Sequence, residues 1–299
     1  MKTEPIPLFL NPVAGRGRAG RSIRQIASKL DSLGVSHVLV ESESVGNLET
    51  RVIDAVSAGA ARILVAGGDG SIHEVVNGIL RTGNSVELGV IPIGTGNDFA
   101  KACSIPVQWE EAVQELAGRL QDNTPARQID AGRMNDRYFA NGAGIGFDAK
   151  VNRIARDIRW RIGDLVYLVA ILKGMVDGVI TPQVTMKFSD QTIEGPITLA
   201  NVSNGAWVGG MFHIAPMARN DDGELDLIFA GPVSRLRILA LLPKLIQGSH
   251  IEQPEITHAR LTRCQITAAS AVPSHLDGEV QPLQTHFDFE IMKGALRLM

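Results

Sequence analysis

The chain has 299 residues, of which 44% are hydrophobic and 20% charged, and its formal net charge at pH 7 is -3. This length and composition suit one or two globular domains with buried cores and exclude a disordered chain. The slightly acidic balance gives no reason to expect nucleic acid as a partner.

Strand and helix patterns alternate through the first 120 residues. Apolar runs typical of buried strands are followed by segments whose apolar residues are spaced three and four apart, as in helices. The predicted strands are 6–10, 35–41, 62–68 and 87–93. The predicted helices are one that ends at Gly34, one over 47–58, one that begins at Ser71 and one over 109–120. This alternation predicts a parallel sheet covered on both faces.

After about residue 125 the pattern changes to short strands separated by turns. Residues 127–147 read as a hairpin that turns at Asn135 and Asp136, and residues 182–204 as another that turns near Ser189 and Asp190. Further strands are predicted at 224–230, 263–268 and 285–292, with helices near 150–176 and 234–248. We predict two domains, 1–125 and 126–299, the second mostly antiparallel, with its last segment returning to the first.

The cysteines and the apolar runs indicate in which cellular compartment the protein is expected. Cys103 and Cys264 are far apart and lie near no histidine or cysteine cluster, which favours reduced thiols in a cytoplasmic protein. The apolar run near the N-terminus is too short for a signal peptide. The most apolar stretch, 164–176, is shorter than the roughly 20 residues of a membrane span, and Lys173 interrupts it. We expect a cytoplasmic protein, able to sit on the inner membrane face.

Three glycine-rich segments follow predicted strands and precede predicted helices. They are NPVAGRGRAG at 11–20, GGDGSIHEVVNG at 67–78 and IPIGTGNDFAKA at 91–102. Glycine allows backbone N–H groups to approach phosphate oxygens, and a helix N-terminus adds partial positive charge. Because the carboxyl ends of parallel strands share one edge of a sheet, the three segments are predicted to converge on one ligand crevice.

The first segment also has the G-x-G-x-x-G spacing of dinucleotide-binding proteins, with Glu41 about twenty residues further on. Asn11 and Pro12 come before the first glycine and set a turn of their own. Arg16 and Arg18 add positive charge that suits a triphosphate. We therefore do not read this segment as the dinucleotide site of a dehydrogenase.

The second segment has a structural alternative. A tight turn with Ser71 as the helix N-cap, completed by Glu74 as a capping box, explains GGDGS without any ligand. Asp69 makes little sense beside phosphates alone, since like charges repel. It makes sense if it orients a magnesium ion or the water bound to one.

Four motifs in order, NPVAG, GGDGS, IPIGTGNDFA and HLDGE, resemble the diacylglycerol kinase catalytic family, and within it the soluble bacterial lipid kinases related to sphingosine kinases. NAD kinases and phosphofructokinases carry segments similar to GGDG, but GTGND and DGE favour the lipid-kinase branch. The resemblance implies an α/β nucleotide-binding domain followed by an antiparallel β-sandwich, with the active site in the cleft between. It also implies phosphorylation of a lipid hydroxyl, such as that of diacylglycerol, with ATP and Mg²⁺.

The resemblance assigns nucleotide-binding positions residue by residue. Ser71 replaces the commoner threonine, and His73 stands where asparagine is usual, so a merely structural histidine is the alternative there. The positions that match are Asn11, Pro12, Val13, Ala14, Gly15, Ser42, Gly67, Gly68, Asp69, Gly70, Ser71, Ile72, His73 and Thr95.

The catalytic assignments centre on Glu279 in SHLDGEV. On its own, LDGE reads as a hairpin turn that exposes a glutamate. The resemblance implies instead that Glu279 takes the proton of the lipid hydroxyl as it attacks the γ-phosphate. Asp69 and Asp98 then organise magnesium and the phosphates, and Asp130 extends their network.

The acidic segment ARNDDGELDL, 218–227, tempts an EF-hand reading. Gly223 as the sixth loop residue puts Ala218 first and Phe229 twelfth, and neither supplies the carboxylate that the loop requires. An acidic turn before a strand is the plain alternative. The resemblance implies a structural magnesium held by the Asp222 side chain and the carbonyls of Arg219 and Glu224.

The sequence also gives expectations about the membrane, the lipid acceptor and a second copy of the chain as partners. Arg153, Arg156, Arg159 and Arg161 precede the apolar helix at 164–176, which predicts contact with anionic lipid, simple packing on the domain being the alternative. Segments 141–148 and 205–216 are expected to be flexible walls for the lipid acceptor, and relatives suggest a homodimer. Two other functions stay open, namely an NAD kinase-like or sugar kinase and a non-catalytic nucleotide-binding regulator. The presence of Asp69, Asp98 and Glu279 argues against the regulator.

Overall fold

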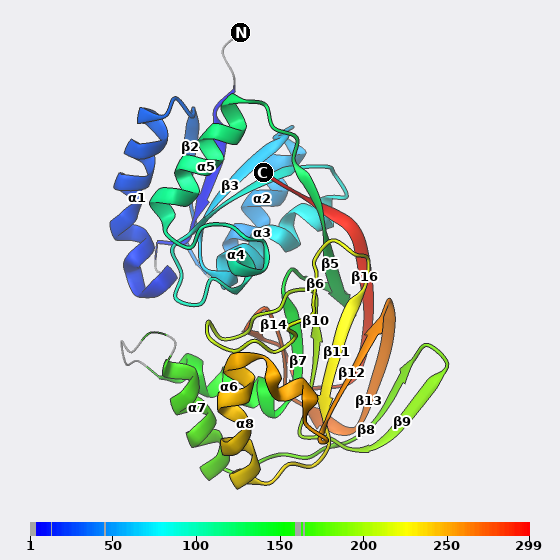
Figure 1. Cartoon of the computed structure of the whole chain (residues 1–299). Helices are drawn as coiled ribbons and strands as arrows, with labels where there is room; N and C mark the ends of the chain where they lie inside the picture. Colours follow the sequence, from blue (N-terminus) through cyan, green and yellow to red (C-terminus); the bar gives the residue numbers. More distant parts are fainter. Residues whose placement is uncertain (1–3, 13, 45, 159–162, 164) are drawn as a thin grey trace. The chain divides into compact units, whose positions relative to one another are not determined.

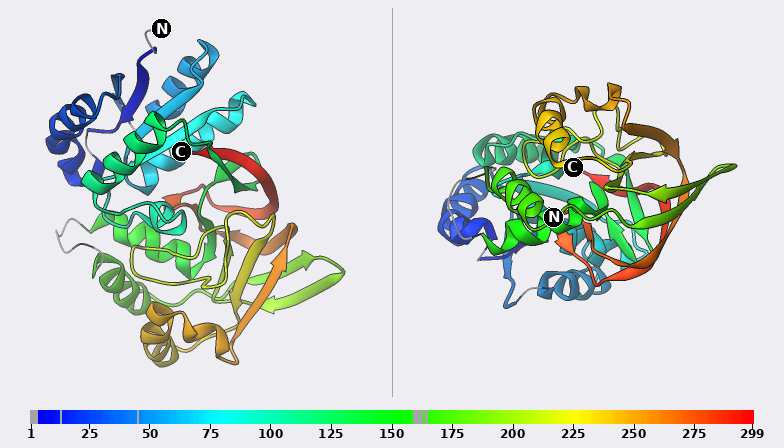
Figure 2. Two further views of the ribbon diagram at one scale, coloured as in Figure 1. Left: turned by 45° about the horizontal axis from the view of Figure 1, so that its top comes forward. Right: turned by 90° about the horizontal axis from the view of Figure 1, so that it is seen from below.

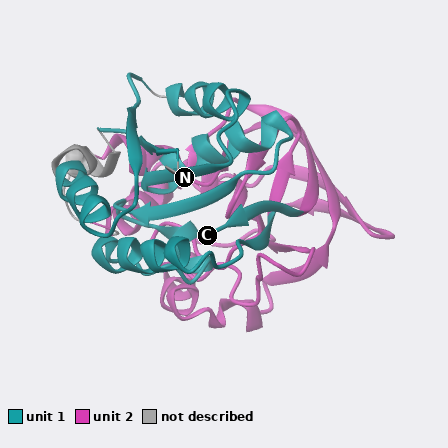
Figure 3. Ribbon diagram, turned by 90° about the horizontal axis from the view of Figure 1, so that it is seen from above, with its two compact units in different colours: residues 1–130, 294–299 teal, residues 131–293 magenta. Residues whose placement is uncertain are grey.

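The computed structural model describes residues 4–12, 14–44, 46–158, 163 and 165–299, with the side chains of residues 14–21 left out. The predicted site residue Val13 and the arginines at 159 and 161 lie outside the described residues. The chain divides into two compact units (Figure 3), residues 1–130 with 294–299 as unit 1 and residues 131–293 as unit 2. The last segment of the chain therefore belongs to the first unit.

Unit 1 is built around a parallel sheet with the strand order β2-β1-β3-β4, to which the end of β16 adds a further parallel strand at Arg297 and Leu298. The strands are β1 (Ile6–Leu10), β2 (His37–Glu41), β3 (Arg62–Gly67) and β4 (Glu87–Pro92). The helices between them are α1 (Ala14–Ser32), α2 (Asn47–Ser57), α3 (Asp69–Thr82), the short α4 (Asp98–Ala102) and α5 (Trp109–Gln121). The predicted α/β class is confirmed.

Both faces of this sheet are covered (Figure 1). Helices α1 and α5 bury Leu30 and Leu116 against strand residues such as Leu64. Helices α2 and α3 pack on each other and cover the opposite face. The inner strands β1, β3 and β4 are consequently mostly apolar and buried, as parallel strands covered on both faces require, whereas the edge strand β2 is largely exposed. What the helices leave uncovered are the ends of the strands.

Unit 2 is a sandwich of two antiparallel sheets, as predicted. One sheet has the order β12-β11-β10-β7-β14-β15, and the other contains β16, β13, β8 and β9 with the β5–β6 hairpin. Ile145 and Leu227 from the first sheet meet Ile266 and Phe287 from the second in one core. The strands are β5 (Arg127–Met134), β6 (Arg137–Phe139), β7 (Gly142–Gly146), β8 (Gln183–Phe188), β9 (Gln191–Pro196), β10 (Leu199–Ser203), β11 (Leu225–Ala230), β12 (Ile256–Leu261), β13 (Arg263–Val272), β14 (Ser274–Leu276), β15 (Glu279–Val280) and β16 (Gln284–Leu298).

Three helices accompany the sandwich, α6 (Phe147–Asp157), α7 (Leu165–Val176) and α8 (Arg235–Gln247), and they share an apolar cluster. A 3-10 turn, η1 (Ser249–Glu252), follows α8. The two predicted hairpin turns are confirmed, because Asn135 and Ser189 adopt positive φ angles of 54° and 50°. The β8–β9 hairpin projects from the rest of the unit in both views of Figure 2.

Three expectations about local structure are wrong. Helix α1 begins at Ala14, so the glycines at 15, 17 and 20 lie within a helix and not in a loop. Helix α3 begins at Asp69 with Gly68 as its N-cap, and Glu74 instead accepts the N–H groups of Gly46 and Leu48 at the start of α2. Tertiary contact with α2 thus outcompetes the local capping box. Segment 141–148 is not a flexible wall, since it contains the buried strand β7.

A substitution at Gly132 tests the packing of unit 2. It lies opposite Phe139 in the β5–β6 hairpin, and a Cβ at this position would lie 1.9 Å from the phenyl ring. Phe139 is fully buried and packs edge-to-face on Phe289. Because ring and methyl cannot share this space, we expect Gly132→Ala to lower the free energy of unfolding by about 1–3 kcal/mol in urea denaturation. The control Gly231→Ala meets open space, and equal midpoints for both variants would contradict this account.

Candidate active site

The strand ends of unit 1 lie in register at one edge. Leu10 at the end of β1 pairs with Glu41 of β2 and Ala66 of β3, and Gly67 pairs with Pro92 of β4. Just beyond the strands, the Ser42 N–H donates to the Leu10 carbonyl at 2.8 Å. The segments that follow all four strands therefore emerge together. Helices α1 and α3 begin at this same edge.

Two glycine turns approach each other closely at this edge. A Cβ on Gly68 would lie 2.9 Å from the Gly94 Cα, and a Cβ on Gly94 would lie 2.5 Å from the Gly68 Cα. Gly67 is equally constrained, because its Cβ would lie 2.4 Å from the Ser71 Cβ. Any side chain here would push the two backbones apart. The glycines are required for close approach rather than for a left-handed conformation.

Asp69 joins the starts of α3 and α4. Its Oδ1 accepts the Phe99 N–H at 3.0 Å, while Asn97, with a φ of 52°, accepts the Gly94 N–H at 2.9 Å through Oδ1. Asp98 is the first residue of α4 and is buried, with Lys101 Nζ 3.9 Å from its Oδ1. The two predicted catalytic aspartates of unit 1 thus begin neighbouring helices, within reach of the glycine turns.

The remaining predicted residues of unit 1 differ in accessibility. Thr95 is exposed in the second turn, whereas Ser42 and Ser71 are buried. His73 is 3% exposed, and its ring Nε2 lies 3.4 Å from the Asn77 amide one helical turn away. This contact fits the structural alternative for His73. Asp130 is also buried, and its Oδ1 accepts the Gly294 N–H at 2.6 Å.

The residues predicted to hold metal fall into two groups. Within the described parts of the chain, no group of three or more His, Cys, Asp and Glu side chains is arranged to hold a metal ion. Asp69 and Asp98 nevertheless fit the requirement of magnesium, which takes one or two carboxylates and completes its shell with phosphate oxygens and water. Asp130 does not join them in a carboxylate cluster.

The acidic loop of unit 2 does not fit magnesium as it is arranged. Asp222 accepts the Glu224 N–H at 3.1 Å through one oxygen, and its other oxygen pairs with the guanidinium of Arg260. Arg260 also pairs with the side chain of Glu224, and Arg219 pairs with Asp221 at 3.3 Å. The Asp222 carboxylate that was predicted to bind magnesium is therefore already paired with an arginine.

Glu279 follows a two-residue hairpin turn between β14 and β15. Asp277 and Gly278 have φ angles of 50° and 85°, the double positive φ of a type I′ turn. The predicted hairpin is confirmed. The Glu279 side chain is 38% exposed, and Arg156 Nη1 of α6 lies 3.4 Å from its Oε2. A carboxylate on a tight turn, beside a cation and open to solvent, can accept a proton from a ligand.

Asp277 fixes the first residue of that turn. Its Oδ1 accepts the N–H groups of Asn141 at 2.8 Å and Gly142 at 3.0 Å, and its Oδ2 accepts that of Ala140 at 3.0 Å. In return, the Asp277 N–H donates to the Gly142 carbonyl at 2.8 Å. The sequence identified Asp277 only as a turn former. Its capping of the β6–β7 connection depends on a contact across more than 130 positions, which no local pattern reveals.

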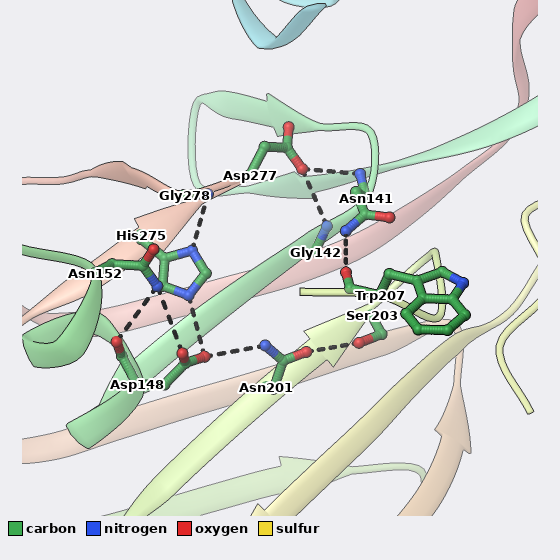
Figure 4. A network of polar contacts seen from close by, with 10 residues as sticks. All are labelled: Asn141, Gly142, Asp148, Asn152, Asn201, Ser203, Trp207, His275, Asp277 and Gly278. Carbon is green, nitrogen blue, oxygen red and sulfur yellow. Dashed lines mark hydrogen bonds and ion pairs between the residues drawn. The ribbon is translucent and has the colours of Figure 1, made fainter. Parts of the chain in front are cut away.

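His275 and Asp148 form a second contact behind the turn (Figure 4). His275 Nδ1 accepts the Gly278 N–H at 3.2 Å, and its Nε2 lies 3.1 Å from Asp148 Oδ2. Burial raises the pKa of Asp148, but its interaction with His275 and the hydrogen bond from Asn201 outweigh this and hold the pKa below its ordinary value. Asp148 is therefore a carboxylate at neutral pH. Sequence reasoning missed both residues, since they are 127 positions apart.

Comparison with known proteins shows to which families the two parts of the chain are similar. Residues 5–133 match the model of the diacylglycerol kinase catalytic domain, and residues 142–299 match that of the YegS C-terminal NAD kinase beta sandwich-like domain. A diacylglycerol kinase of Bacillus subtilis is 30% identical over 278 residues, which are 91% of this chain and 88% of the relative. A protein of Pseudomonas aeruginosa named "Probable lipid kinase YegS-like" is 32% identical over 256 residues, 85% of this chain and 81% of the relative.

A solved structure shares the fold. The crystal structure of a diacylglycerol kinase from Bacillus anthracis str. Sterne matches with a TM-score of 0.73, covering 100% of this chain and 97% of the other at 20% sequence identity. At that identity the likeness concerns the fold alone.

Proposed function

The chain belongs to the diacylglycerol kinase catalytic-domain family of lipid kinases, and from that premise we propose that it transfers the γ-phosphate of ATP to the hydroxyl group of a lipid such as diacylglycerol. The observation that carries the ATP half of the proposal is the shared edge of unit 1. There the turns after β3 and β4 touch, and α1 and α3 begin. Backbone N–H groups and two helix N-termini at one edge suit a chain of phosphates.

Magnesium would reach this edge together with ATP, held by Asp69 and Asp98. A bound Mg²⁺ neutralises charge on the phosphate oxygens during transfer. The protein holds the two carboxylates in position. Asp69 is fixed by the Phe99 N–H, and Asp98 sits at the start of α4, so neither carboxylate needs to reorganise its backbone to meet a cation.

The acceptor half of the proposal rests on Glu279. A lipid hydroxyl is a weak nucleophile, so a carboxylate within hydrogen-bond reach must take its proton as it attacks. In unit 2 the Glu279 carboxylate is partly exposed and stands on a turn that is held on both of its residues.

Segment 205–216, the other predicted wall for the acceptor, contributes Ile214 to an apolar cavity beneath α8 that Phe147 and Leu242 also line. Its volume of about 80 Å³ admits a few methylene groups and not a whole acyl chain, so the lipid class of the acceptor rests on the family alone.

Contact with a membrane is a further part of the proposal. Of the ten large apolar side chains that are exposed among the described residues, six lie on α7 and α8. They are Leu165, Leu172, Val176, Leu236, Leu239 and Ile246. The exposed Arg153 and Arg156 lie on the adjacent α6. None of the described helices is long and apolar enough to span a membrane, so contact would be with the surface.

Replacing two of these side chains tests that surface. Val176 is 78% exposed and Leu236 is 80% exposed, so a double change to Asp disturbs no core. Because burying one such side chain contributes about 1.5–3 kcal/mol, we expect the double variant to bind anionic vesicles more than tenfold less tightly in sedimentation assays. The control Val107→Asp is an equally polar change at an exposed site in unit 1. Equal binding by wild type and double variant would refute the membrane contact.

The function itself is tested by transfer of labelled phosphate from ATP to total lipid extract, followed by identification of the product. A panel of diacylglycerol, phosphatidylglycerol, a sphingoid base and a polyprenol then defines the acceptor. Labelling of NAD or a sugar in place of any lipid would point to the small-molecule kinase. ATP binding without transfer to any acceptor would point to the regulator.

A further inference from the structure

Three neighbouring strands of unit 2 place His275, Gly144 and Asn201 side by side, because His275 on β14 and Asn201 on β10 both pair with Gly144 of β7. Figure 4 shows that His275 and Asn201 both point toward Asp148. The Asp148 carboxylate lies over the glycine. A Cβ on Gly144 would lie 2.1 Å from Asp148 Oδ2 and 2.2 Å from His275 Nε2. The glycine therefore leaves the space that lets the carboxylate and the imidazole meet.

The hydrogen bonds of this network fix the proton on His275. A backbone N–H can only donate, so the Gly278 N–H requires an unprotonated Nδ1, and the ring proton lies on Nε2, where it points to Asp148 Oδ2. The Asn201 amide donates to the same Asp148 oxygen at 3.1 Å, and Asn201 Oδ1 accepts the Ser203 hydroxyl at 2.6 Å. Each link has one donor and one acceptor, which selects a single neutral tautomer.

We propose that Asp148 and His275 form a positioning pair that sets the Glu279 carboxylate for proton abstraction, an inference that rests on the proposed function. His275 is 1% exposed and holds the N–H of Gly278, the residue before Glu279. Asp277 is held independently by the β6–β7 connection. With His275 in place, both residues of the turn are fixed, and the direction of the Glu279 side chain is fixed with them.

The size of the effect follows from the demands of proton transfer. A general base works within hydrogen-bond reach of its proton, and a misplacement of about 1 Å costs on the order of 10²-fold in rate. If the Gly278 contact is lost, the turn keeps the contacts of Asp277 and the pairing of Leu276 with Glu279 between β14 and β15, but Gly278 itself is no longer held by His275. The Glu279 carboxylate then samples more directions, while its charge and the residues around it stay the same.

The same unit offers a matched control. His258 on β12 lies 2.7 Å from Asp226 Oδ1 of the neighbouring strand β11, and the Asp226 side chain is 2% exposed. This is also a histidine–aspartate pair, on the same six-stranded sheet, but neither residue contacts the β14–β15 turn. Breaking it removes a comparable interaction without touching Glu279.

Two substitutions separate the contacts of His275. In His275→Asn the amide oxygen stands near the position of Nδ1 and can still accept the Gly278 N–H. In His275→Gln the amide reaches the position of Nε2 and can contact only Asp148. We expect His275→Gln to lower kcat by roughly 10–100-fold with the KM for ATP unchanged, and His275→Asn to retain most of the activity. His258→Gln should lower Tm but leave kcat as in the wild type.

A double-mutant cycle decides between positioning and a merely structural role. Because His275 acts through Glu279, His275→Gln should cause no further loss in a Glu279→Gln background. Losses that multiply in the double variant overturn the inference and leave the proposed function intact. A wild-type protein that phosphorylates no lipid overturns the proposed function and this inference with it.

A measurement on the unmodified protein guards against variants that do not fold. With histidine labelled by ¹⁵N, NMR distinguishes the two neutral tautomers and the cation. We expect the ring proton of His275 to lie on Nε2, because Nδ1 accepts the Gly278 N–H. A proton on Nδ1, or a doubly protonated ring, would exclude the contact with Gly278 and overturn the inference.

Discussion

Glu279→Gln is expected to lower the turnover of lipid phosphorylation by roughly 10²–10⁴-fold, the usual contribution of a general base. The amide keeps the size of the carboxylate and can still accept from Arg156 across the present 3.4 Å contact, but it cannot take a proton at neutral pH. The KM for ATP should stay unchanged, because the predicted nucleotide residues all lie in unit 1. Steady-state kinetics with the preferred lipid acceptor measure both quantities.

Two further variants test whether the effect is specific to the carboxylate of Glu279. Glu279→Asp keeps the carboxylate but shortens the side chain by one methylene. Its turnover should therefore lie between that of the wild type and that of Glu279→Gln. Glu194→Gln makes the same change of charge at an exposed position on β9 and should leave turnover unchanged. Near-normal turnover in Glu279→Gln would remove Glu279 from the chemistry, whatever the acceptor.

Gly94→Ala is expected to weaken ATP binding at least tenfold and to destabilise the protein by about 1–3 kcal/mol. The added Cβ would lie 2.5 Å from the Gly68 Cα and 2.7 Å from Asn97 Oδ1. Neither neighbour can move freely, since Gly68 is the N-cap of α3 and Asn97 holds the Gly94 N–H. The two turns must separate, and the N–H groups around them lose their common direction.

Calorimetric titration with ATP measures the binding loss, and urea denaturation measures the stability. Gly118→Ala in α5 is the matched control, because a Cβ there meets nothing within 4 Å and alanine is favoured over glycine in a helix by about 1 kcal/mol. It should bind ATP normally and gain stability. Unchanged ATP affinity in Gly94→Ala would mean that the contact of the two turns serves the fold alone.

Much of the architecture could be predicted because it is written in local patterns. Runs such as IPLFL and RILVAG became β1 and β3, and the turns at Asn135, Ser189 and Asp277 were recognisable from residues that tolerate positive φ. The convergence of the glycine segments followed from one rule about parallel strands. These features depend on neighbours in the chain, so the sequence displays them directly.

The errors arose where a tertiary partner competed with a local one. Ser71 and Glu74 have the spacing of a capping box, but Glu74 caps α2 instead. The glycines of 141–148 suggested mobility, yet Gly144 is glycine because Asp148 and His275 occupy its side-chain space. Glycine in a sequence does not distinguish a flexible segment from a crowded one.

The sequence by itself determined the class of the two domains, the place of the glycine-rich turns and the glutamate that follows the LDG turn, because each is set by residues within a few positions. Only the tertiary structure decided that Arg260 takes up the Asp222 carboxylate and that Asp148, His275 and Asp277 hold the turn before Glu279. The contacts of Arg260 with Asp222, of Asp148 with His275 and of Asp277 with the β6–β7 connection join residues 38 to 137 positions apart, whereas the contact of His275 with Gly278 is local. The contribution of these contacts to stability depends on how deeply they are buried and on the geometry between donor and acceptor. Neither the burial nor the geometry can be read from the spacing of residues in the chain.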